Sequence, residues 1–334
     1  MKMKSFFTFS FMLIMLSNIT AQENKRNFKI HTVAFYNLEN LFDTINDVNK
    51  NDEARPIMEI RFNRGKIYRE KVSNMAEVVS QIGFDVTKRP PSIVGICEVE
   101  NRMVVEDLIS DEKLREYNYG IVHYESPDDR GIDVGLIYNK DVFKVKNSNS
   151  HDVFITDNNS SKRRNTRDQL VVSGHLDGEL MHFIVNHWPS RGADETKRIA
   201  AAEVNNFIID SLRNKYESPK IITMGDFNDD PFDKSIKKIL GAKKNINDIK
   251  KNDLYNPFET ILVDEGVGSN AYRDKWQLFD QIILSKPFLD KNYKDYQLYK
   301  AGVFNKSFLI NKKGKFKGYP FRSFSYGTFT GGYS

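Results

Sequence analysis

The chain has 334 residues, of which 40% are hydrophobic, so it is long and apolar enough to bury a sizeable core. Its 50 Lys and Arg residues exceed its 45 Asp and Glu residues by only five, and this balance does not by itself require a polyanionic partner. The single cysteine, Cys97, cannot form an internal disulfide. Cys97 lies in an apolar run, which predicts a packing role rather than a nucleophile.

The first 21 residues have the pattern of a secretory signal peptide. Lys2 and Lys4 precede the apolar run FFTFSFMLIML, and we expect cleavage after Ala21. The run is short for a transmembrane helix, and no cysteine follows it that could carry a lipid. An uncleaved membrane anchor is the alternative. We therefore expect a secreted or periplasmic protein that has no stable membrane insertion once the signal is removed.

Apolar runs and helical periodicities alternate along the rest of the chain. Helices are predicted over residues 66–83 and 194–216, the second with Asp194 as N-cap. Strands are predicted over residues 30–36, 91–98, 131–139, 169–176, 179–188, 221–224 and 279–285. A polar surface loop is expected over residues 43–66. This alternation is typical of one large α/β or α+β domain.

Acids and amides stand at the ends of the apolar strands. In chain order they are Asn37 with Glu39, Glu98 with Glu100, Asp226 with Asn228, and Asp280 at the start of a strand. Strand ends on one sheet edge converge, and side chains two residues apart point the same way. Converging carboxylates repel one another unless a cation lies among them, and oxygen ligands favour Mg²⁺, Mn²⁺ or Ca²⁺. Ordinary turns are the alternative, and four such motifs in one chain disfavour it.

The motif NHWPSRG contributes groups of another kind. His187 and Arg191 on a loop at a strand end suit the binding of an anionic phosphate. The alternative is a packed turn in which His187 is a satisfied polar residue. Arg163, Arg164 and Arg167 precede an expected strand and could also reach a phosphate, although a plain basic loop explains them equally well.

These motifs together resemble a known superfamily. The order YNLEN, ICEVEN, RGIDVGLIYN, NHWPSR, MGDFND and FDQIILS is similar to that of the endonuclease/exonuclease/phosphatase superfamily, the DNase I-like metallohydrolases, and especially to its secreted bacterial members. The resemblance runs from about His31 to the C-terminus. It implies a four-layer αββα sandwich in which two mixed β-sheets pack face to face between helices.

The resemblance also implies roles for individual residues. Glu98 matches the metal ligand, with Asn37 and Glu39 beside it, and the ion would be Mg²⁺, or else Mn²⁺ or Ca²⁺. Asp226 matches the aspartate that orients or deprotonates the attacking water. Asn228 matches the neighbour that holds the nucleophile and a phosphate oxygen.

Two further matches concern the phosphate. His187 matches a histidine that contacts it, and Asp280 matches an aspartate that hydrogen-bonds a catalytic histidine near the C-terminus. In the superfamily that histidine belongs to a Ser-Asp-His segment followed by a last strand, whereas this sequence has no histidine after His187 and reaches Ser334 where the segment should begin. We therefore expect a domain over residues 28–334 that lacks its last strand through truncation. The chain as given is expected to hydrolyse weakly or not at all, and to be less stable than a longer parent.

The resulting hypothesis is a secreted, divalent-metal-dependent, endonuclease-like phosphodiester hydrolase that acts as a monomer. Its substrate class includes nucleic acid, and a run of ten Lys and Arg residues against two Asp from Lys286 onward is compatible with a polyanion, although a solvated surface explains it better. The alternatives are a phosphatase or phospholipid phosphodiesterase of the same fold, a non-catalytic phosphate-binding homologue, and an unrelated α/β protein with acidic turns.

Overall fold

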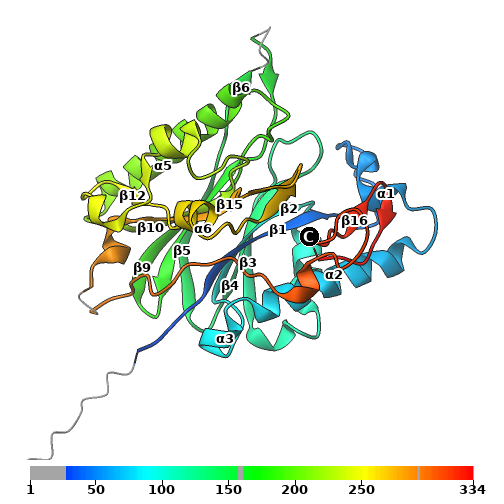
Figure 1. The fold of residues 1–334 in the computed structure, drawn as a ribbon, viewed down its shortest axis with the longest axis horizontal. Coiled ribbons are helices and arrows are strands. Elements are labelled where there is room, and N and C mark those ends of the chain that lie inside the picture. The colour runs from blue at the N-terminus through cyan, green and yellow to red at the C-terminus, as the bar shows by residue number, and fades with distance from the viewer. Residues whose placement is uncertain (1–27, 157–160, 292–293, 334) are drawn as a thin grey trace, which may run out of the picture. The chain divides into compact units, whose positions relative to one another are not determined.

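The computed structural model describes residues 28–156, 161–291 and 294–333 (Figure 1). The chain divides into two units, residues 1–30 and 31–334, and the second unit carries all the helices and strands of the described residues. The predicted signal peptide, residues 1–21, lies outside the described residues. Within the described part, no helix combines the length and the apolar character that a membrane crossing needs.

The first sheet contains four strands in the order β1–β2–β4–β3. They are β1 (Val33–Leu41), β2 (Ile93–Val99), β4 (Asp133–Asn139) and β3 (Tyr119–His123). β1 and β2 are parallel, whereas β4 is antiparallel to both of its neighbours, so the sheet is mixed.

The second sheet contains seven strands and is mixed as well. In order across the sheet they are β11 (Ala242–Lys243), β12 (Leu254–Tyr255), β15 (Asp280–Ser285), β10 (Lys220–Asp226), β9 (Glu179–His187), β8 (Gln169–Leu176) and β5 (Phe143–His151). β9 and β10 are parallel, and β10 and β15 are antiparallel. The central strands are almost wholly buried, as continuous apolar runs predict for a sheet covered on both faces.

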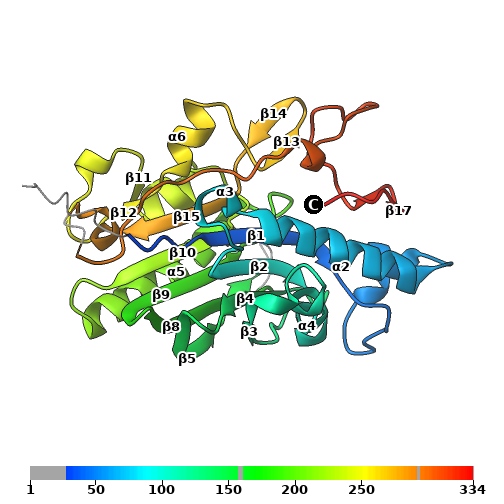
Figure 2. The same ribbon diagram turned by 90° about the horizontal axis from the view of Figure 1, so that it is seen from below.

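The two sheets pack face to face, with helices on their outer sides (Figure 2). The core between them includes Cys97, whose predicted packing role is confirmed. α2 (Arg64–Gln81) and α4 (Arg102–Ser110) cover the first sheet, and α5 (Glu195–Lys215) covers the second. The predicted four-layer αββα arrangement with two mixed sheets is therefore confirmed.

Shorter elements connect these layers. They are α1 (Pro56–Glu59), α3 (Phe84–Thr87), α6 (Phe258–Val263), the strand pairs β6 (Ile155–Thr156) with β7 (Arg163–Arg164), β13 (Asn270–Tyr272) with β14 (Lys275–Gln277) and β16 (Phe324–Ser325) with β17 (Thr328–Phe329), the 3₁₀ turns Asp52–Ala54, Arg115–Tyr117, Ile246–Asp248, Lys286–Leu289 and Ser307–Leu309, and the π turn Ser235–Ile239. The segment that carries β16 and β17 lies beside α2 in both ribbon views.

Local sequence explains where the longer helices begin. Asp194 caps α5 as predicted, because its carboxylate accepts a hydrogen bond from the Thr196 backbone N–H at 2.9 Å. Asn101 caps α4 in the same way by accepting from the Val104 backbone N–H at 3.1 Å. The cap of α4 follows β2 directly, so the chain turns into a helix immediately after it has delivered the acids at the strand end.

The strand register brings the predicted site residues to one place. In the parallel pair β9–β10, His187 lies opposite Asp226, and in the antiparallel pair β10–β15, Asp226 lies opposite Asp280. β1 lies beside β2 with Asn37 opposite Cys97, the residue before Glu98. β1 also extends beyond the predicted end of its strand, because the pairing shifts register between Asn37 and Leu41 and then continues.

The second sheet also contains a buried histidine outside this site. His182 is 1% exposed, its Nδ1 lies 2.7 Å from Ser173 Oγ, and its Nε2 has no hydrogen-bond partner. Burial, together with the charges of Lys146 and Lys215, lowers the pKa of His182 to about 4. The folded protein therefore holds a neutral imidazole at a pH where the unfolded chain, with an ordinary pKa of about 6.5, already binds a proton.

This difference predicts a specific loss of stability in acid. Because the unfolded state takes up the proton first, the free energy of unfolding should fall by about 2 kcal/mol as the pH drops from about 6.5 to 4. Urea unfolding of His182→Gln should show a shallower fall over this range, while a His175→Gln control on the neighbouring strand β8 keeps the wild-type slope. Equal slopes for His182→Gln and the wild type would contradict the assignment.

Candidate active site

Three potential ligand groups converge where the strands of the two sheets end. One side-chain atom from each of Glu98, His187 and Asp226 lies within 4.8 Å of the other two. Asn37 connects the acids, because its Nδ2 donates to Glu98 Oε1 at 3.2 Å and to Asp226 Oδ2 at 3.1 Å. His187 Nε2 lies 3.8 Å from Glu98 Oε1. The structure thus brings together residues that are up to 189 positions apart in the sequence.

A left-handed backbone conformation aims Glu98 at this place. Glu98 has a φ of 59° and Asn40 a φ of 54°, values that non-glycine residues seldom adopt. The Asn40 backbone N–H and its side-chain Nδ2 both donate to Glu98 Oε2 at 2.9 Å. These two bonds hold one carboxylate oxygen, and the other, Oε1, remains directed toward Asn37 and His187.

Asp226 and Asp280 place two further carboxyl groups near Glu98. Asp226 Oδ1 accepts from the Asn228 backbone N–H at 2.9 Å. Burial, followed by the charges of Asp280 and Glu98, raises the pKa of Asp226 to about 8, and burial raises the pKa of Asp280 to about 6. Asp280 Oδ1 is buried and has no hydrogen-bond partner among the described residues. None of these three acids forms an ion pair with a lysine or arginine of the described chain.

His187 is held as a neutral ring beside these acids. It is 6% exposed, and burial together with the charges of Arg167 and Arg130 lowers its pKa well below the ordinary value. Its Nδ1 is buried and finds no hydrogen-bond partner in the described part of the chain. A neutral imidazole can offer a lone pair to a cation from one nitrogen or an N–H to a phosphate oxygen from the other.

This donor set fits a divalent cation. It contains carboxylate oxygens from Glu98 and Asp226 and an imidazole nitrogen from His187, and no basic side chain of the described chain pairs with either acid. Hard oxygen ligands suit Mg²⁺ or Ca²⁺, and the added imidazole suits Mn²⁺. Acids that lie this close together without a basic partner are the physical reason to expect an ion here.

Glu39 does not face the same place as Asn37, contrary to the alternation expected of a strand. Its φ of 46° turns the side chain away, and its Oε2 accepts from both the backbone N–H and the Oγ of Ser323 at 2.6 Å. The buried Lys71 ammonium donates to the Glu39 carbonyl and to Ser323 Oγ. The structure therefore places the Glu39 carboxylate with the C-terminal segment, whereas Asn37 lies with Glu98 and Asp226.

The two predicted phosphate-binding arginines contact protein groups. Arg167 is 5% exposed and donates to the backbone carbonyls of His187 and Trp188 and to Asp128, so it supports the loop that carries His187. Arg191 pairs with acids of the loop after β10 and donates to the Asn228 carbonyl at 3.1 Å. Both guanidinium groups position site loops through these contacts.

Several neighbours of the site were not predicted from the sequence. Asn40 is the last residue of the YNLEN motif, and the alternation of side chains along a strand would place it on the opposite face from Asn37. Arg55 donates from Nη1 to Asn40 Oδ1 at 3.4 Å, and its buried Nε has no partner. Burial and the nearby charge of Arg130 lower the pKa of Arg55. Arg55 was hidden in a polar loop that gives no periodic signal, and only the fold brings it to Asn40 and hence to Glu98.

A second group of potential ligands was also missed. One atom from each of His123, Glu125 and Asp133 lies within 4.8 Å of the other two. The Asp133 carboxylate lies 3.0 Å from His123 Nε2 and accepts from the Ser126 backbone N–H at 2.7 Å. Both of its oxygens therefore have protein partners, which is sufficient to account for this buried aspartate.

Comparison with solved structures gives several distant matches. A mannosyl-6-phosphatase from Bacteroides thetaiotaomicron is 19% identical, with a TM-score of 0.49, over 76% of this chain and 84% of that chain. An endonuclease/exonuclease/phosphatase family protein from the same organism is 18% identical, with a TM-score of 0.45, over 76% and 80% of the two chains. The human Nocturnin catalytic domain is 16% identical, with a TM-score of 0.44, over 64% and 75%.

The search of curated protein sequences found no significant match. The family model described as "Endonuclease/Exonuclease/phosphatase family", however, matches residues 32–334. This match includes every residue of the Glu98, His187 and Asp226 group. The family unites enzymes that hydrolyse phosphate esters with the help of a divalent metal. The chain belongs to the endonuclease/exonuclease/phosphatase family.

Proposed function

We propose that the chain is a divalent-metal-dependent phosphodiester hydrolase with endonuclease-like cleavage. The observation that carries this proposal is the meeting of Glu98, Asp226 and His187 at one point, with negative charge that no basic side chain of the described chain balances. A divalent cation bound there would neutralise charge on the phosphate and on the leaving oxygen. Membership of the family supports the same chemistry.

Asp226 is proposed to position the attacking water and accept its proton. Two hydrogen bonds, from Asn37 Nδ2 and from the Asn228 backbone N–H, fix both of its oxygens. A carboxylate with a raised pKa takes up a proton from water more readily than an ordinary one, and such general-base assistance contributes about 10²–10⁴-fold to a rate.

The phosphate is proposed to bind between His187 and the arginines at the edge of the site. The Asn228 amide already donates to the Trp188 carbonyl at 2.9 Å, which places the Asn228 side chain beside the His187 loop. Arg55 has a buried Nε with no hydrogen-bond partner among the described residues. Arg130 donates to Asp128 from Nε and Nη2, but its side chain is 40% exposed and its Nη1 remains as a donor. Both guanidinium groups therefore have a donor to offer to a phosphate oxygen.

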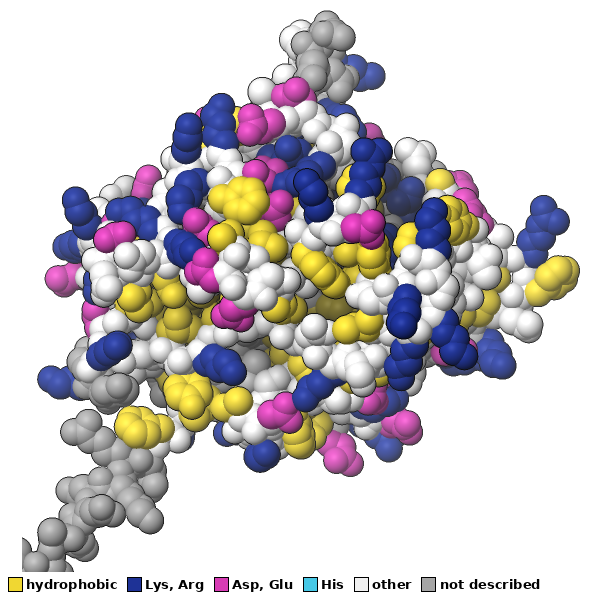
Figure 3. Space-filling view, viewed as in Figure 1, with side chains coloured by type: hydrophobic (Ala, Val, Ile, Leu, Met, Phe, Trp, Pro, Cys, Tyr) yellow, Lys and Arg dark blue, Asp and Glu magenta, His cyan; other side chains and the backbone are white. Residues whose placement is uncertain are grey.

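Nucleic acid is one candidate substrate, and the distribution of surface charge does not favour nucleic acid over other phosphate esters. Lys and Arg side chains are spread over the face seen in Figure 3 and mixed with Asp and Glu. Two lysines of the basic C-terminal stretch are paired with acids, Lys286 with Asp290 and Lys306 with Asp85. We propose secretion of the protein on the basis of its first 21 residues alone.

Phosphate binding without turnover is the second candidate function. It is favoured by Asp280, whose buried Oδ1 has no hydrogen-bond partner among the described residues. An aspartate without a polar partner is less able to orient a neighbouring group for the reaction, whereas the group of Glu98, Asp226 and His187 can still bind a cation and a phosphate.

Hydrolysis of bis(p-nitrophenyl) phosphate with Mg²⁺ or Mn²⁺, compared with the same assay in chelator, tests the proposal. We expect slow turnover that requires the cation. In calorimetry, Glu98→Gln should bind Mn²⁺ at least about tenfold more weakly than the wild type. Equal Mn²⁺ binding by the variant would refute the metal site. Metal-dependent binding of inorganic phosphate without any turnover would instead support the second candidate.

A further inference from the structure

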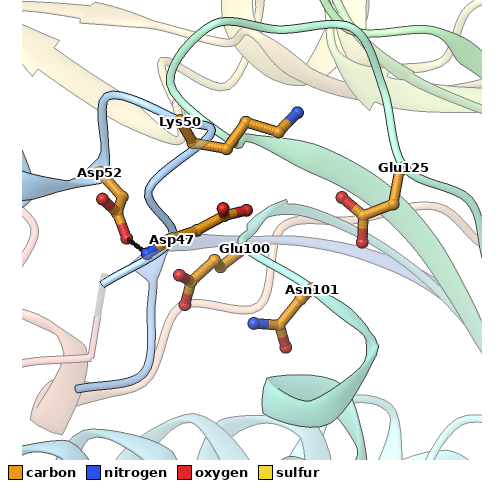
Figure 4. Close-up of a pocket in the computed structure, with 7 residues that line it drawn as sticks. Asp47, Lys50, Asp52, Glu100, Asn101 and Glu125 are labelled. Carbon is orange, nitrogen blue, oxygen red and sulfur yellow. Dashed lines mark hydrogen bonds between the residues drawn. The ribbon is translucent and has the colours of Figure 1, made fainter. Parts of the chain in front are cut away.

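A second group of acids surrounds a cavity of about 120 Å³ (Figure 4). Asp47 and Asp52 come from the loop that follows β1, Glu100 from the end of β2, and Glu125 from the loop that follows β3. Figure 4 shows Asp52, Asp47 and Glu100 next to one another, with Glu125 on the other side of the cavity. Asp43 lies behind Glu100, because its backbone N–H donates to Glu100 Oε2 at 2.7 Å.

Two of these acids are buried and only partly satisfied. Asp52 is 0% exposed; its Oδ2 accepts from the Asp47 backbone N–H at 2.8 Å, and its Oδ1 is buried with no hydrogen-bond partner among the described residues. Glu100 is 7% exposed, and within the described chain it accepts a hydrogen bond through Oε2 but none through Oε1. A buried carboxylate oxygen without a partner, such as Asp52 Oδ1, is rare and costly.

Their charge is not balanced by nearby basic groups. In the described parts of the chain, Asp43, Asp47, Asp52 and Glu100 form no ion pair within 4.0 Å with a lysine, arginine or histidine. Lys50 borders the cavity, but its ammonium donates to the backbone carbonyls of Ser126 at 3.1 Å and Asp128 at 3.4 Å. The cavity therefore combines a space, clustered acids and unused oxygen ligands.

We propose that this cavity binds a second divalent cation of the calcium class. Its four acids and the Asn101 side chain offer oxygen donors. Ca²⁺ accepts six to eight oxygen ligands in irregular geometry, whereas Mg²⁺ demands a near-ideal octahedron. The loop sequence Asp47-x-Asn49-x-Asn51 has the alternation of ligands with which calcium-binding loops begin. The site is distinct from that of Glu98, whose Oε1 turns instead toward His187.

The expected role of this cation is to hold three loops in place beside the active site. The Arg55 backbone N–H donates to the Asp52 carbonyl at 2.8 Å, so a cation bound by Asp52 would fix the start of the turn that carries Arg55. The Asn51 backbone N–H donates to the Asp129 carbonyl at 2.8 Å, which connects the same loop to Arg130. Calcium would thus order both arginines that we propose for the phosphate.

Calcium titration of the full chain after removal of metals with chelator tests the proposal. Calorimetry should give a calcium-binding event that persists in Glu98→Gln and is at least about tenfold weaker when Asp47→Asn or Asp52→Asn is added to that variant. Calcium should also raise Tm by a few degrees in Glu98→Gln but not in the two double variants. Glu203→Gln, an exposed acid on α5, is the matched control and should behave as the wild type.

Two results would overturn the proposal. One is the loss of all calcium binding in Glu98→Gln, which would mean that the only site is at Glu98. The other is a calcium affinity of Glu98→Gln that stays unchanged when Asp47→Asn is added. Asp47 is exposed, so its variant should fold even where Asp52→Asn does not, and far-UV circular dichroism checks this point. Protection of the segment 43–55 from proteolysis by calcium in Glu98→Gln would support the proposed ordering.

Discussion

Asp226→Asn should lower kcat for phosphodiester hydrolysis by about 10²–10⁴-fold and change KM little. Asparagine keeps the size of the side chain and can still accept the hydrogen bond from the Asn228 backbone N–H at 2.9 Å. Asparagine cannot accept a proton from water, so the substitution raises the free energy of the transition state and leaves substrate binding nearly unchanged. Because the change removes one of three clustered acids, we expect no loss of Tm in chelator.

The measurement is steady-state kinetics with Mn²⁺ at saturating concentration, together with calorimetry of Mn²⁺ binding. Asp233→Asn is a matched control. Asp233 lies in the loop that follows Asp226 and forms an ion pair with Arg191, but it is not part of the group of Glu98, His187 and Asp226. We expect it to retain kcat within about threefold. A kcat for Asp226→Asn equal to that of the wild type, with Mn²⁺ bound, would exclude Asp226 as the base.

The fold was predictable because its buried strands are continuous apolar runs that end at polar residues. The run before Asp226 and the run before His187 both become central strands of the second sheet, and their parallel pairing sets these two residues opposite each other. Helix α5 begins where its N-cap predicts. These features depend on local chemistry, which a sequence displays directly.

The directions of the acidic side chains were less predictable. Strand alternation places Glu98 with Glu100 and Asn37 with Glu39, but both Glu39 and Glu98 have positive φ. Glu98 therefore faces His187 while Glu100 faces Asp43, and Glu39 faces Ser323. A left-handed conformation at a non-glycine residue is imposed by tertiary hydrogen bonds, and no residue type signals it.

The groups that each arginine contacts could not be predicted from the sequence either. Arg167 and Arg191 stand close to predicted site residues, yet their guanidinium groups are occupied by carbonyls and acids. Arg55, in a loop without periodicity, keeps a buried Nε without a partner. Whether an arginine supports a loop or offers its donors to a ligand depends on which acceptors the fold brings to it, and those acceptors are distant in sequence.

Trp188→Ala should lower the free energy of unfolding by about 3–5 kcal/mol. Trp188 is 1% exposed and packs edge-to-face on Phe227 with ring centroids 4.7 Å apart. Its Nε1 donates to Asn186 Oδ1 at 3.2 Å. Truncation would leave a large cavity in the core between α5 and the second sheet, together with an acceptor that has lost one donor.

The same substitution should also weaken the site, because the Trp188 backbone connects its parts. The Trp188 N–H donates to the Asp226 carbonyl at 2.9 Å, and the Trp188 carbonyl accepts from Asn228 Nδ2 at 2.9 Å and from Arg167. Any shift of this backbone into the cavity would separate His187 from Asp226. We therefore expect weaker Mn²⁺ binding in Trp188→Ala even at temperatures where it remains folded.

Urea unfolding in chelator measures the first effect, and Mn²⁺ calorimetry well below Tm measures the second. Trp188→Phe is the matched control, since it keeps an aromatic ring against Phe227 and loses only the Nε1 donor and part of the volume. We expect Trp188→Phe to cost about 1–2 kcal/mol of unfolding free energy and to bind Mn²⁺ nearly as the wild type does.

A cost below about 1 kcal/mol for Trp188→Ala would show that the core collapses around the smaller side chain. Wild-type Mn²⁺ affinity in Trp188→Ala would show that the backbone hydrogen bonds of residue 188 keep His187 next to Asp226 without the packing of the indole ring.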